Sequence, residues 1–259
     1  MPTVEFRNIS KYYENSEGNQ VAVLKDINLT VKDGEFVCIL GPSGCGKSTL
    51  LEIAAGLLSQ SEGEILLDGK ALSGTSRDVG VVFQDSSLFN WRNVRKNVEF
   101  GLEIAGVDKQ KRAQTAQKAI EIVGLKGFEN KYPHQLSGGM RQRAGIARTL
   151  VNNPACILMD EPFSAVDHLT RLTLQDEVIR IWQQQKKTII FITHDVSEAV
   201  YLSNRVVLLT PGPGRINKIF EVPLEWPRKR NDQRIIEIID KIYYSMNNPN
   251  SKDEIEYMI

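Results

Sequence analysis

Residues 41–48 read Gly-Pro-Ser-Gly-Cys-Gly-Lys-Ser, a glycine-rich run that ends in a lysine and a hydroxyl side chain. The apolar run 36–40 precedes it and the helix-like run 49–57 follows it, which is the strand–loop–helix context of a phosphate-binding loop. Glycines let the backbone N–H groups point inward at phosphate oxygens, and the new helix adds the positive end of its dipole. Lys47 can reach the β- and γ-phosphates, and the Ser48 hydroxyl can bind Mg²⁺. The spacing predicts a nucleoside triphosphate site; a glycine-rich turn without a ligand is the alternative.

A second candidate anion site is the run Leu-Ser-Gly-Gly-Met-Arg-Gln at residues 136–142. Ser137, Gly138 and Gly139 come directly before a helix that we expect from Met140 to Val151, so unpaired N–H groups and the helix dipole face outward. The alternative is an N-cap serine with a flexible Gly-Gly entry. Its place between a phosphate-binding loop and an acidic strand end favours the anion site.

That acidic strand end is Cys-Ile-Leu-Met-Asp-Glu at residues 156–161. Four consecutive apolar residues suit a strand that is buried on both faces of a parallel sheet. The two carboxylates then emerge at the carboxyl edge of the sheet, where open α/β folds bind their ligands. Asp160 can hold Mg²⁺, and Glu161 can polarise the water that attacks the γ-phosphate. A solvated Asp-Glu pair is the alternative.

These three motifs together resemble those of the ATP-binding cassette (ABC) ATPases, and the resemblance runs from about residue 3 to about residue 223. It implies that Ser137, Gly138 and Gly139 grip the γ-phosphate of ATP held by a second copy of the chain. It also implies that the pair drives integral membrane permease subunits and, indirectly, serves a solute-binding protein. The expected location is peripheral, on the cytoplasmic face of the cell membrane.

Three single residues fall where the same family carries functional side chains. Gln84 lies at the Q-loop position, where an amide touches Mg²⁺ or the lytic water. His194 lies at the switch-histidine position, where an imidazole bonds the γ-phosphate and holds Glu161 in place; a purely structural histidine is the alternative. Asp167 matches the D-loop that faces the partner copy, although Val166 stands where leucine is usual.

An aromatic residue near the N-terminus is expected to stack on adenine. The family pattern favours Tyr13, with Tyr12 as the competitor, because adjacent strand residues point to opposite faces. Both tyrosines packing in a β-rich edge is the neutral alternative.

The resemblance implies ATP and Mg²⁺ as cofactors. The expected Mg²⁺ ligands are Ser48, Gln84 and Asp160, and the expected catalytic residues are Glu161, His194, Gln84 and Lys47. The full set expected to bind ATP is Tyr13, Gly41, Pro42, Ser43, Gly44, Cys45, Gly46, Lys47, Ser48, Thr49, Gln84, Ser137, Gly138, Gly139, Asp160 and His194.

Composition bounds the partners of this chain of 259 residues. Its 32 basic and 32 acidic residues give a formal net charge of zero, which offers no electrostatic case for nucleic acid. The N-terminus lacks a secretion signal, and no apolar run reaches the roughly 20 residues of a membrane span. We therefore expect a soluble protein that reaches the membrane through partners.

The three cysteines are Cys38, Cys45 and Cys156. Two lie in predicted strands and one in the phosphate loop, and the odd count predicts reduced thiols in the cytosol. Cys45 sits among inward-pointing amides beside Lys47, which favours a thiolate. We expect a thiol reagent to inactivate the protein there and Mg-ATP to protect it.

The pattern along the chain predicts an α/β fold: a RecA-like P-loop core with an antiparallel β edge subdomain and an inserted α-helical subdomain. The expected boundaries are 1–85 and 155–225 for the core with its β subdomain, 86–154 for the helical subdomain that carries the signature, and 226–259 for a helical tail. Within the tail, isoleucines recur at the spacing of an amphipathic helix, at positions 235, 238, 239 and 242.

The transported solute leaves weaker signals. The run 85–98, with Trp91, and the run 209–216 look like the nitrate, sulfonate and taurine group of importer ATPases. Phe89, Trp91 and Arg92 would line the groove for a coupling helix of the membrane subunit; Trp91 as core filler is the alternative. The basic run 228–230 is expected to be a solvated loop, with contact to lipid headgroups as the alternative.

Other function classes fit less well. An ABC ATPase of translation or DNA repair needs two cassettes or a long coiled-coil insertion, and the chain shows neither. A P-loop kinase has no use for the second anion site or for Glu161, and a GTPase needs an Asn-Lys-x-Asp run that the sequence lacks. An exporter remains an alternative, although its cassette is often fused to membrane helices. We expect an importer subunit that dimerises on ATP.

Overall fold

The computed structural model describes residues 3–164 and 166–248, and its core is a six-stranded sheet. The strands lie in the order β10 (Ile216–Glu221), β9 (Arg205–Leu209), β3 (Phe36–Leu40), β8 (Thr188–Thr193), β7 (Cys156–Asp160) and β6 (Val79–Val82). Neighbours from β9 to β6 are parallel, and only β10 runs antiparallel to its neighbour. Every residue of β3 and β8 is buried, because helices or a second sheet cover both faces.

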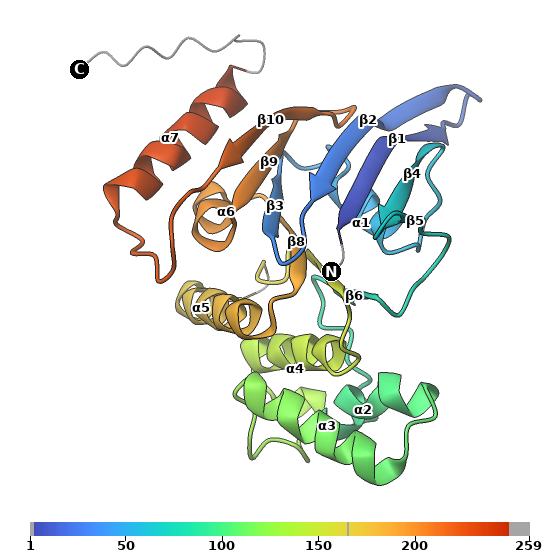
Figure 1. Ribbon diagram of the computed structural model, residues 1–259, viewed down its shortest axis with the longest axis vertical. Helices are drawn as coiled ribbons and strands as arrows, with labels where there is room; N and C mark the ends of the chain where they lie inside the picture. Colours follow the sequence, from blue (N-terminus) through green and yellow to red (C-terminus); the bar gives the residue numbers. More distant parts are fainter. Residues whose placement is uncertain (1–2, 165, 249–259) are drawn as a thin grey trace.

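A second, antiparallel sheet packs beside the first (Figure 1). Its strands lie in the order β2 (Gln20–Val31), β1 (Val4–Glu14), β4 (Glu62–Leu67) and β5 (Lys70–Ala71). In β2 the buried residues Ile27, Leu29 and Val31 alternate with exposed ones, which is the pattern of a strand with one face on the core. This face, helix α1 (Lys47–Ala54) and one side of the central sheet share a hydrophobic cluster.

Three helices form a separate group at the lower end of the molecule in Figure 1. They are α2 (Val94–Ile104), α3 (Lys109–Ile122) and α4 (Gly138–Leu150), with a 3₁₀ turn, η1, at Pro133–Gln135 before α4. The remaining helices are α5 (His168–Gln185), α6 (Val196–Leu202) and α7 (Gln233–Asn247). Six helices begin at a residue whose side chain accepts a hydrogen bond from the first turn, namely Asn93, Asp108, Ser137, Asp167, Asp195 and Asp232.

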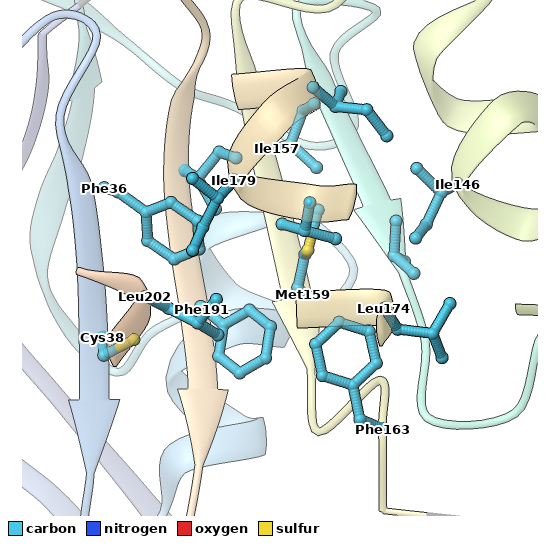
Figure 2. Close-up of a cluster of buried hydrophobic side chains, with 14 of the residues drawn as sticks. Phe36, Cys38, Ile146, Ile157, Met159, Phe163, Leu174, Ile179, Phe191 and Leu202 are labelled. Carbon is cyan, nitrogen blue, oxygen red and sulfur yellow. The ribbon is translucent and has the colours of Figure 1, made fainter. Parts of the chain in front are cut away.

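Buried side chains between the central sheet and α5 pack along three strands of the sheet (Figure 2). Phe191 on β8 lies with its ring centroid 6.0 Å from that of Phe36 and 5.6 Å from that of Phe163. Figure 2 shows Met159 of β7 and Leu174 of α5 closing over the same rings. Because protein interiors are close-packed, β3, β7 and β8 form a rigid base for whatever follows them.

The predicted α/β fold, with its antiparallel edge sheet and helical insertion, is confirmed. The helix expected from Met140 to Val151 begins earlier, at Gly138, because the Ser137 side chain caps it there. The helix ends at Leu150. The amphipathic helix expected in the tail is α7, whose Ile235 and Ile242 are buried. Within the described part of the chain, no helix combines the length and apolar character needed to cross a membrane.

The prediction of a solvated or lipid-facing basic run at 228–230 is wrong for Arg228. Its side chain is buried, and its guanidinium donates hydrogen bonds to the backbone carbonyls of Val200, Ser203 and Leu224. It also stacks on the Trp226 ring, with Cζ 3.7 Å from the ring centroid. The guanidinium is therefore an internal cap for the carboxyl end of α6 rather than a surface charge.

Candidate functional site

The loop between β3 and α1 has a backbone that requires glycine. Gly44 and Gly46 have φ angles of 79° and 96°, in the left-handed region that L side chains rarely adopt. A Cβ at Gly46 would also lie 2.7 Å from Cδ2 of Leu24, so the loop packs tightly against β2. Helix α1 starts at Lys47 without a side-chain cap, which leaves its first N–H groups for an anion.

Lys47 places a cation inside this loop. Its side chain is buried, and Nζ donates to the carbonyl oxygens of Gly41 at 2.8 Å and Pro42 at 3.1 Å. Among residues 3–164 and 166–248, no carboxylate lies within ion-pair distance of this ammonium group. A buried charge held only by carbonyl dipoles gains most from an anion, and phosphate oxygens are strong partners for an ammonium group.

Two carboxylates and an imidazole stand at the carboxyl ends of β7 and β8, of which β8 is the direct neighbour of β3. Asp160 ends β7, and its Oδ1 accepts a hydrogen bond from the Ser48 hydroxyl at 3.3 Å. Glu161 follows it, and Oε2 lies 2.9 Å from Nδ1 of His194, which comes directly after β8. Parallel strands thus bring together residues from three distant parts of the chain, and the predicted cluster of Ser48, Asp160, Glu161 and His194 exists.

The backbone at Glu161 has a strained conformation. Its φ is 41°, a left-handed conformation that costs a non-glycine residue on the order of 1–3 kcal/mol. The Glu161 N–H donates to the carbonyl of Ile192 at 3.0 Å, and its own carbonyl accepts from the N–H and the hydroxyl of Ser164. These bonds hold the strained turn and aim the carboxylate at His194. Such strain is typical of functional sites.

The oxygen ligands at this edge suit Mg²⁺. The Ser48 hydroxyl and the Asp160 carboxylate are hard oxygen donors, which is the chemistry that Mg²⁺ prefers. Burial raises the pKa of the Asp160 carboxyl; the Ser48 hydrogen bond opposes this, and the charges of Glu161 and Glu52 add to it. A cation would favour the ionised carboxylate, so these residues fit the metal.

Gln84 lies two residues beyond β6, on the far side of β7 from the phosphate loop. Its side chain is exposed and lines a cavity of about 320 Å³ together with Gly138, Gln142 and Val166. Within the described residues, no hydrogen bond links Gln84 to Ser48 or Asp160. The structure thus places Gln84 at the correct edge of the sheet without a direct contact to the other predicted Mg²⁺ ligands.

Helix α4 fixes the segment around Gln84, which the sequence did not indicate. Gln142 donates from Nε2 to the carbonyl of Phe83 at 3.2 Å, and the Arg148 guanidinium donates to the carbonyls of Ser86 and Ser87. A polar residue on an amphipathic helix is most often solvated. Only the fold shows that Gln142 and Arg148 turn inward and connect the signature helix to the segment 83–87.

The signature residues lie apart from the phosphate loop of the same chain. Figure 1 shows α4 in the lower helical group and α1 among the upper strands. Ser137 and Gly138 are exposed, and the Ser137 Oγ accepts from the N–H of Met140, at 3.3 Å, which is the capping alternative raised from the sequence. Gly139 has no room for a side chain, because a Cβ there would lie 2.6 Å from Cγ2 of Thr170.

Tyr12 and Tyr13 differ in exposure at the end of β1. Tyr13 is 41 % exposed, with the Lys11 ammonium 5.1 Å from its ring centroid. Tyr12 is half-buried, and its hydroxyl bonds the Glu62 carboxylate at 3.3 Å. Tyr13 pairs with Val21 on β2, the strand that the phosphate loop touches. The exposed Tyr13 ring is therefore the freer of the two for stacking.

The structure argues against the thiolate expected at Cys45. The side chain is 1 % exposed, and its Sγ faces the loop itself, 2.8 Å from where a Cβ on Gly41 would lie. Burial raises the pKa of the Cys45 thiol, and the charge of Lys47 opposes this without overcoming it. Cys38 and Cys156 are likewise free and buried.

Trp91 is a surface residue, so the core-filler alternative is wrong. Its side chain is 74 % exposed, and its ring centroid lies 5.3 Å from that of Phe89. Phe89 packs edge-on against Phe100, and the Arg92 guanidinium lies 5.0 Å from the Phe100 ring centroid. A cavity of about 370 Å³ opens beside Phe100, between α2 and β6.

Comparison with known proteins shows the family. The family model described as ABC transporter matches residues 24–164. The chain is 54% identical to an uncharacterized ABC transporter ATP-binding protein, MJ0412, of Methanocaldococcus jannaschii, over 92% of this chain and 89% of that protein. It is 45% identical to the aliphatic sulfonates import ATP-binding protein SsuB of Bacillus cereus, over 93% of this chain and 94% of that protein.

Solved structures share the fold. A dimeric, post-hydrolysis structure of the ATP-binding cassette MJ0796, bound to ADP and Pi, is 32% identical and covers 86% of this chain and 100% of its own, with a TM-score of 0.75. The structure of CbiO1 from Clostridium perfringens, part of an ABC transporter complex, is 26% identical and covers 94% of this chain and 98% of its own, with a TM-score of 0.77.

Proposed function

The chain belongs to the ABC transporter ATPases, and on that premise we propose that it powers an importer as an ATP-dependent pair beneath separate membrane subunits. Family membership makes it an ATP-binding and ATP-hydrolysing subunit. We propose in addition the roles of individual residues, a second copy of the chain, membrane partners and a class of solute.

The observation that carries the catalytic assignment is the 2.9 Å contact between Glu161 and His194 beside the phosphate loop. Glu161 accepts the proton of the attacking water, and His194 holds that carboxylate and donates toward the γ-phosphate. Lys47 exchanges its carbonyl partners for the β- and γ-phosphate oxygens. Ser48 and Asp160 would hold Mg²⁺, which when bound neutralises charge on the phosphate oxygens.

We infer that each ATP lies between the phosphate loop of one copy and residues 137–139 of the other. The support is the contrast between the two ends: the signature residues are exposed, and among the described residues they have no contact with the loop of their own chain. A relative of similar fold is a dimer with ADP and Pi. Charge on the γ-phosphate would then be met by donors from both copies, in the manner of preorganised electrostatic stabilisation.

We propose that the membrane subunits dock a helix at the groove between α2 and β6. The exposed Trp91, the aromatic contact of Phe89 with Phe100 and the adjacent cavity support this, because exposed aromatic side chains beside a hollow are typical of interfaces. The chain would then sit on the cytoplasmic face of the cell membrane. Gln84 begins the segment that leads to this groove, so membrane docking would reach the ATP site through it.

The test of the catalytic assignment is steady-state ATP hydrolysis by the Glu161→Gln variant. We expect a rate at least about 10²-fold below wild type, as for the loss of a general base, with ATP binding retained. The matched control is Glu225→Gln, at an exposed glutamate outside the proposed site, which should leave the rate unchanged. Wild-type turnover by Glu161→Gln would show that another group activates the water.

The solute class is tested by transport. The similarity to a sulfonate import protein and the runs 85–98 and 209–216 support a sulfonate, taurine or nitrate importer. Proteoliposomes that contain the chain and its membrane subunits should take up one of these anions only when ATP is supplied. Uptake of none of them, with normal ATP hydrolysis, would reject the solute class and keep the ATPase assignment.

A further inference from the structure

Buried and partly buried side-chain hydrogen bonds connect the segment after β10 with the residue before His194. Arg230 donates from Nη1 to Oε1 of Gln175 at 2.6 Å, and Gln175 donates from Nε2 to Oε1 of Glu198 at 2.8 Å. The Thr193 hydroxyl then donates to the other Glu198 oxygen at 2.5 Å. The path runs from the C-terminal segment through α5 and α6 to the end of β8.

The middle of this path is inside the protein. Gln175, Glu198 and Thr193 are 3 %, 7 % and 2 % exposed. Burial raises the pKa of the Glu198 carboxyl, while the hydrogen bonds from Thr193 and Gln175 favour its ionised form. A buried polar network of this kind is costly unless each member is satisfied, and a satisfied network rigidifies the elements that it joins.

Glu198 contacts the turn that carries His194 twice, through its side chain at Thr193 and through its backbone N–H at Asp195. Thr193 Oγ1 accepts the N–H of Asp195 at 3.0 Å, and Asp195 in turn caps α6 by accepting the N–H of Glu198, also at 3.0 Å. The His194 side chain is 60 % exposed, and its one polar contact in the described residues is Glu161. Because most of this imidazole is exposed, the backbone of the 193–195 turn largely sets where it points.

At its C-terminal end the path begins at Arg230, which lies in a segment held by several contacts to α5 and α6. The Arg230 guanidinium lies 3.6 Å from the Tyr201 ring centroid and also donates to Asp176 Oδ1 at 3.0 Å. The Tyr201 hydroxyl donates to the same Asp176 oxygen at 2.7 Å. Two residues earlier, buried Arg228 bonds the last carbonyls of α6. Figure 1 shows this segment running toward α5 before it turns into α7.

We propose that Glu198, Gln175 and Arg230 are positioning residues for His194, and that docking of the C-terminal segment thereby sets the rate of ATP hydrolysis. The inference rests on the role proposed above for His194. With Arg230 in place, Gln175 is oriented toward Glu198, Glu198 fixes the 193–195 turn, and the imidazole stays within hydrogen-bond distance of Glu161. Without Arg230 the amide of Gln175 can rotate, and the turn loses one support.

The first measurement separates rate from binding. Arg230→Met keeps the aliphatic stem and removes the guanidinium; we expect kcat to fall between about 3- and 100-fold, since small misplacements of a catalytic group cost up to about 10²-fold. ATP affinity should stay within about twofold, because no residue of the path touches the phosphate loop. Lys229→Met, at the exposed neighbouring position, is the matched control and should keep the wild-type rate.

The conservative pair at Thr193 tests the path nearer to the site. Thr193→Val keeps the shape and removes the hydroxyl, and it should lower kcat as Arg230→Met does. Thr193→Ser keeps the hydroxyl and should restore most of the rate. Equal rates in the two Thr193 variants would contradict the proposal. Thermal unfolding of each variant identifies any loss of rate that only follows a loss of fold.

The decisive measurement reports the imidazole itself. The chain has three histidines, so the side-chain ¹⁵N resonances of His194 can be assigned with His134 and His168 as internal references. Arg230→Met and Glu198→Gln should each shift the His194 resonances and leave the other two unchanged. An unshifted His194 signal in both variants would overturn the proposal.

A separate result would address the function on which the proposal rests. If His194→Ala hydrolyses ATP at the wild-type rate, the role of the histidine is wrong. The resonance shifts would still show whether the path positions it.

Discussion

Two helix N-termini in this protein carry the sequence features of an anion site, and they are built in opposite ways. At α1 the chain folds a loop over the helix end, with Gly46 in a left-handed conformation and Lys47 buried beneath. At α4 the helix end is bare: Ser137 and Gly138 are exposed, and a Cβ on Gly138 would meet only the end of the Arg141 side chain, at 3.9 Å.

The difference between the two helix ends indicates which part of the ATP site a single chain can form. The α1 end has its own buried cation, and carboxylates and a histidine stand at nearby strand ends, so we expect it to hold a triphosphate without help. The α4 end has oriented N–H groups, and the cation beside it, Arg141, donates to the Leu136 carbonyl at 2.8 Å instead of being buried beneath the helix end as Lys47 is. A helix N-terminus is worth about 0.3–1 kcal/mol to an anion at an exposed surface, which is too little for binding by itself. The α4 end is therefore expected to act only on a phosphate that another copy already holds.

The largest effect is expected at Lys47, because its replacement removes the buried cation that distinguishes the α1 end from the α4 end. Lys47→Ala should abolish measurable ATP hydrolysis and weaken ATP binding strongly, since the loss of one preorganised charge partner costs about 10²–10³-fold in rate alone. Nucleotide titration and phosphate release measure the two effects. Lys70→Ala, at an exposed strand residue, is the control. Normal affinity in Lys47→Ala would mean that the loop binds no phosphate.

Ser137→Arg changes the α4 end. It should separate ATP binding from ATP hydrolysis, both of which Lys47→Ala is expected to lower. We expect ATP binding to one chain to remain, because Ser137 makes no contact with the phosphate loop of its own chain. Hydrolysis should fail, because a long charged side chain fills the surface on which the second phosphate contact is made. Ser73→Arg, in an exposed turn, controls for the added charge. Loss of ATP binding by Ser137→Arg would show that both ends serve one chain.

A smaller effect, on stability, sharpens the same contrast. Gly46→Ala should lower the free energy of unfolding by about 1–3 kcal/mol, because its φ of 96° and the Leu24 contact both exclude a methyl group. Gly138→Ala should change that free energy by no more than about 1 kcal/mol, and upward, because the site is open and helical. Urea unfolding of both variants without nucleotide measures this. Equal destabilisation would remove the structural distinction between the two helix ends.

The smallest effect is expected at Cys45. Burial raises the pKa of all three thiols, that of Cys156 to about 12, and so disfavours the reactive thiolate. A thiol reagent near neutral pH should label the folded protein slowly, with or without Mg-ATP. Mass spectrometry of the Cys45 peptide measures the rate. Rapid labelling that Mg-ATP prevents would show that Cys45 Sγ opens toward the phosphates.

What the sequence predicted well was local. The phosphate loop, the Asp160–Glu161 strand end and the cap at Ser137 each depend on a few consecutive residues, and the structure has all of them. His194 was harder, because its contact with Glu161 joins two strands that are 33 positions apart. It was accessible only through family resemblance.

What the sequence could not predict depends on burial by distant elements. Cys45 looked activated by Lys47, but desolvation by the surrounding loop outweighs that charge. Arg228 looked like part of a solvated basic run, but three backbone carbonyls at the carboxyl end of α6 accept hydrogen bonds from its guanidinium. Glu198 and Gln142 carry no local signal, because an amphipathic helix shows which face is apolar and not which polar residue turns inward.

The central claim is that one catalytic site needs both helix ends, from two copies. Sedimentation velocity of Glu161→Gln with Mg-ATP tests it most directly, because that variant should hold ATP without cleaving it. We expect a monomer without nucleotide, a dimer with Mg-ATP, and a monomer again when Ser137→Arg is added to Glu161→Gln. Because ATP would form part of the interface, ATP binding and association must favour each other. A dimer in the double variant, or a monomer in Glu161→Gln at saturating Mg-ATP, would contradict the account.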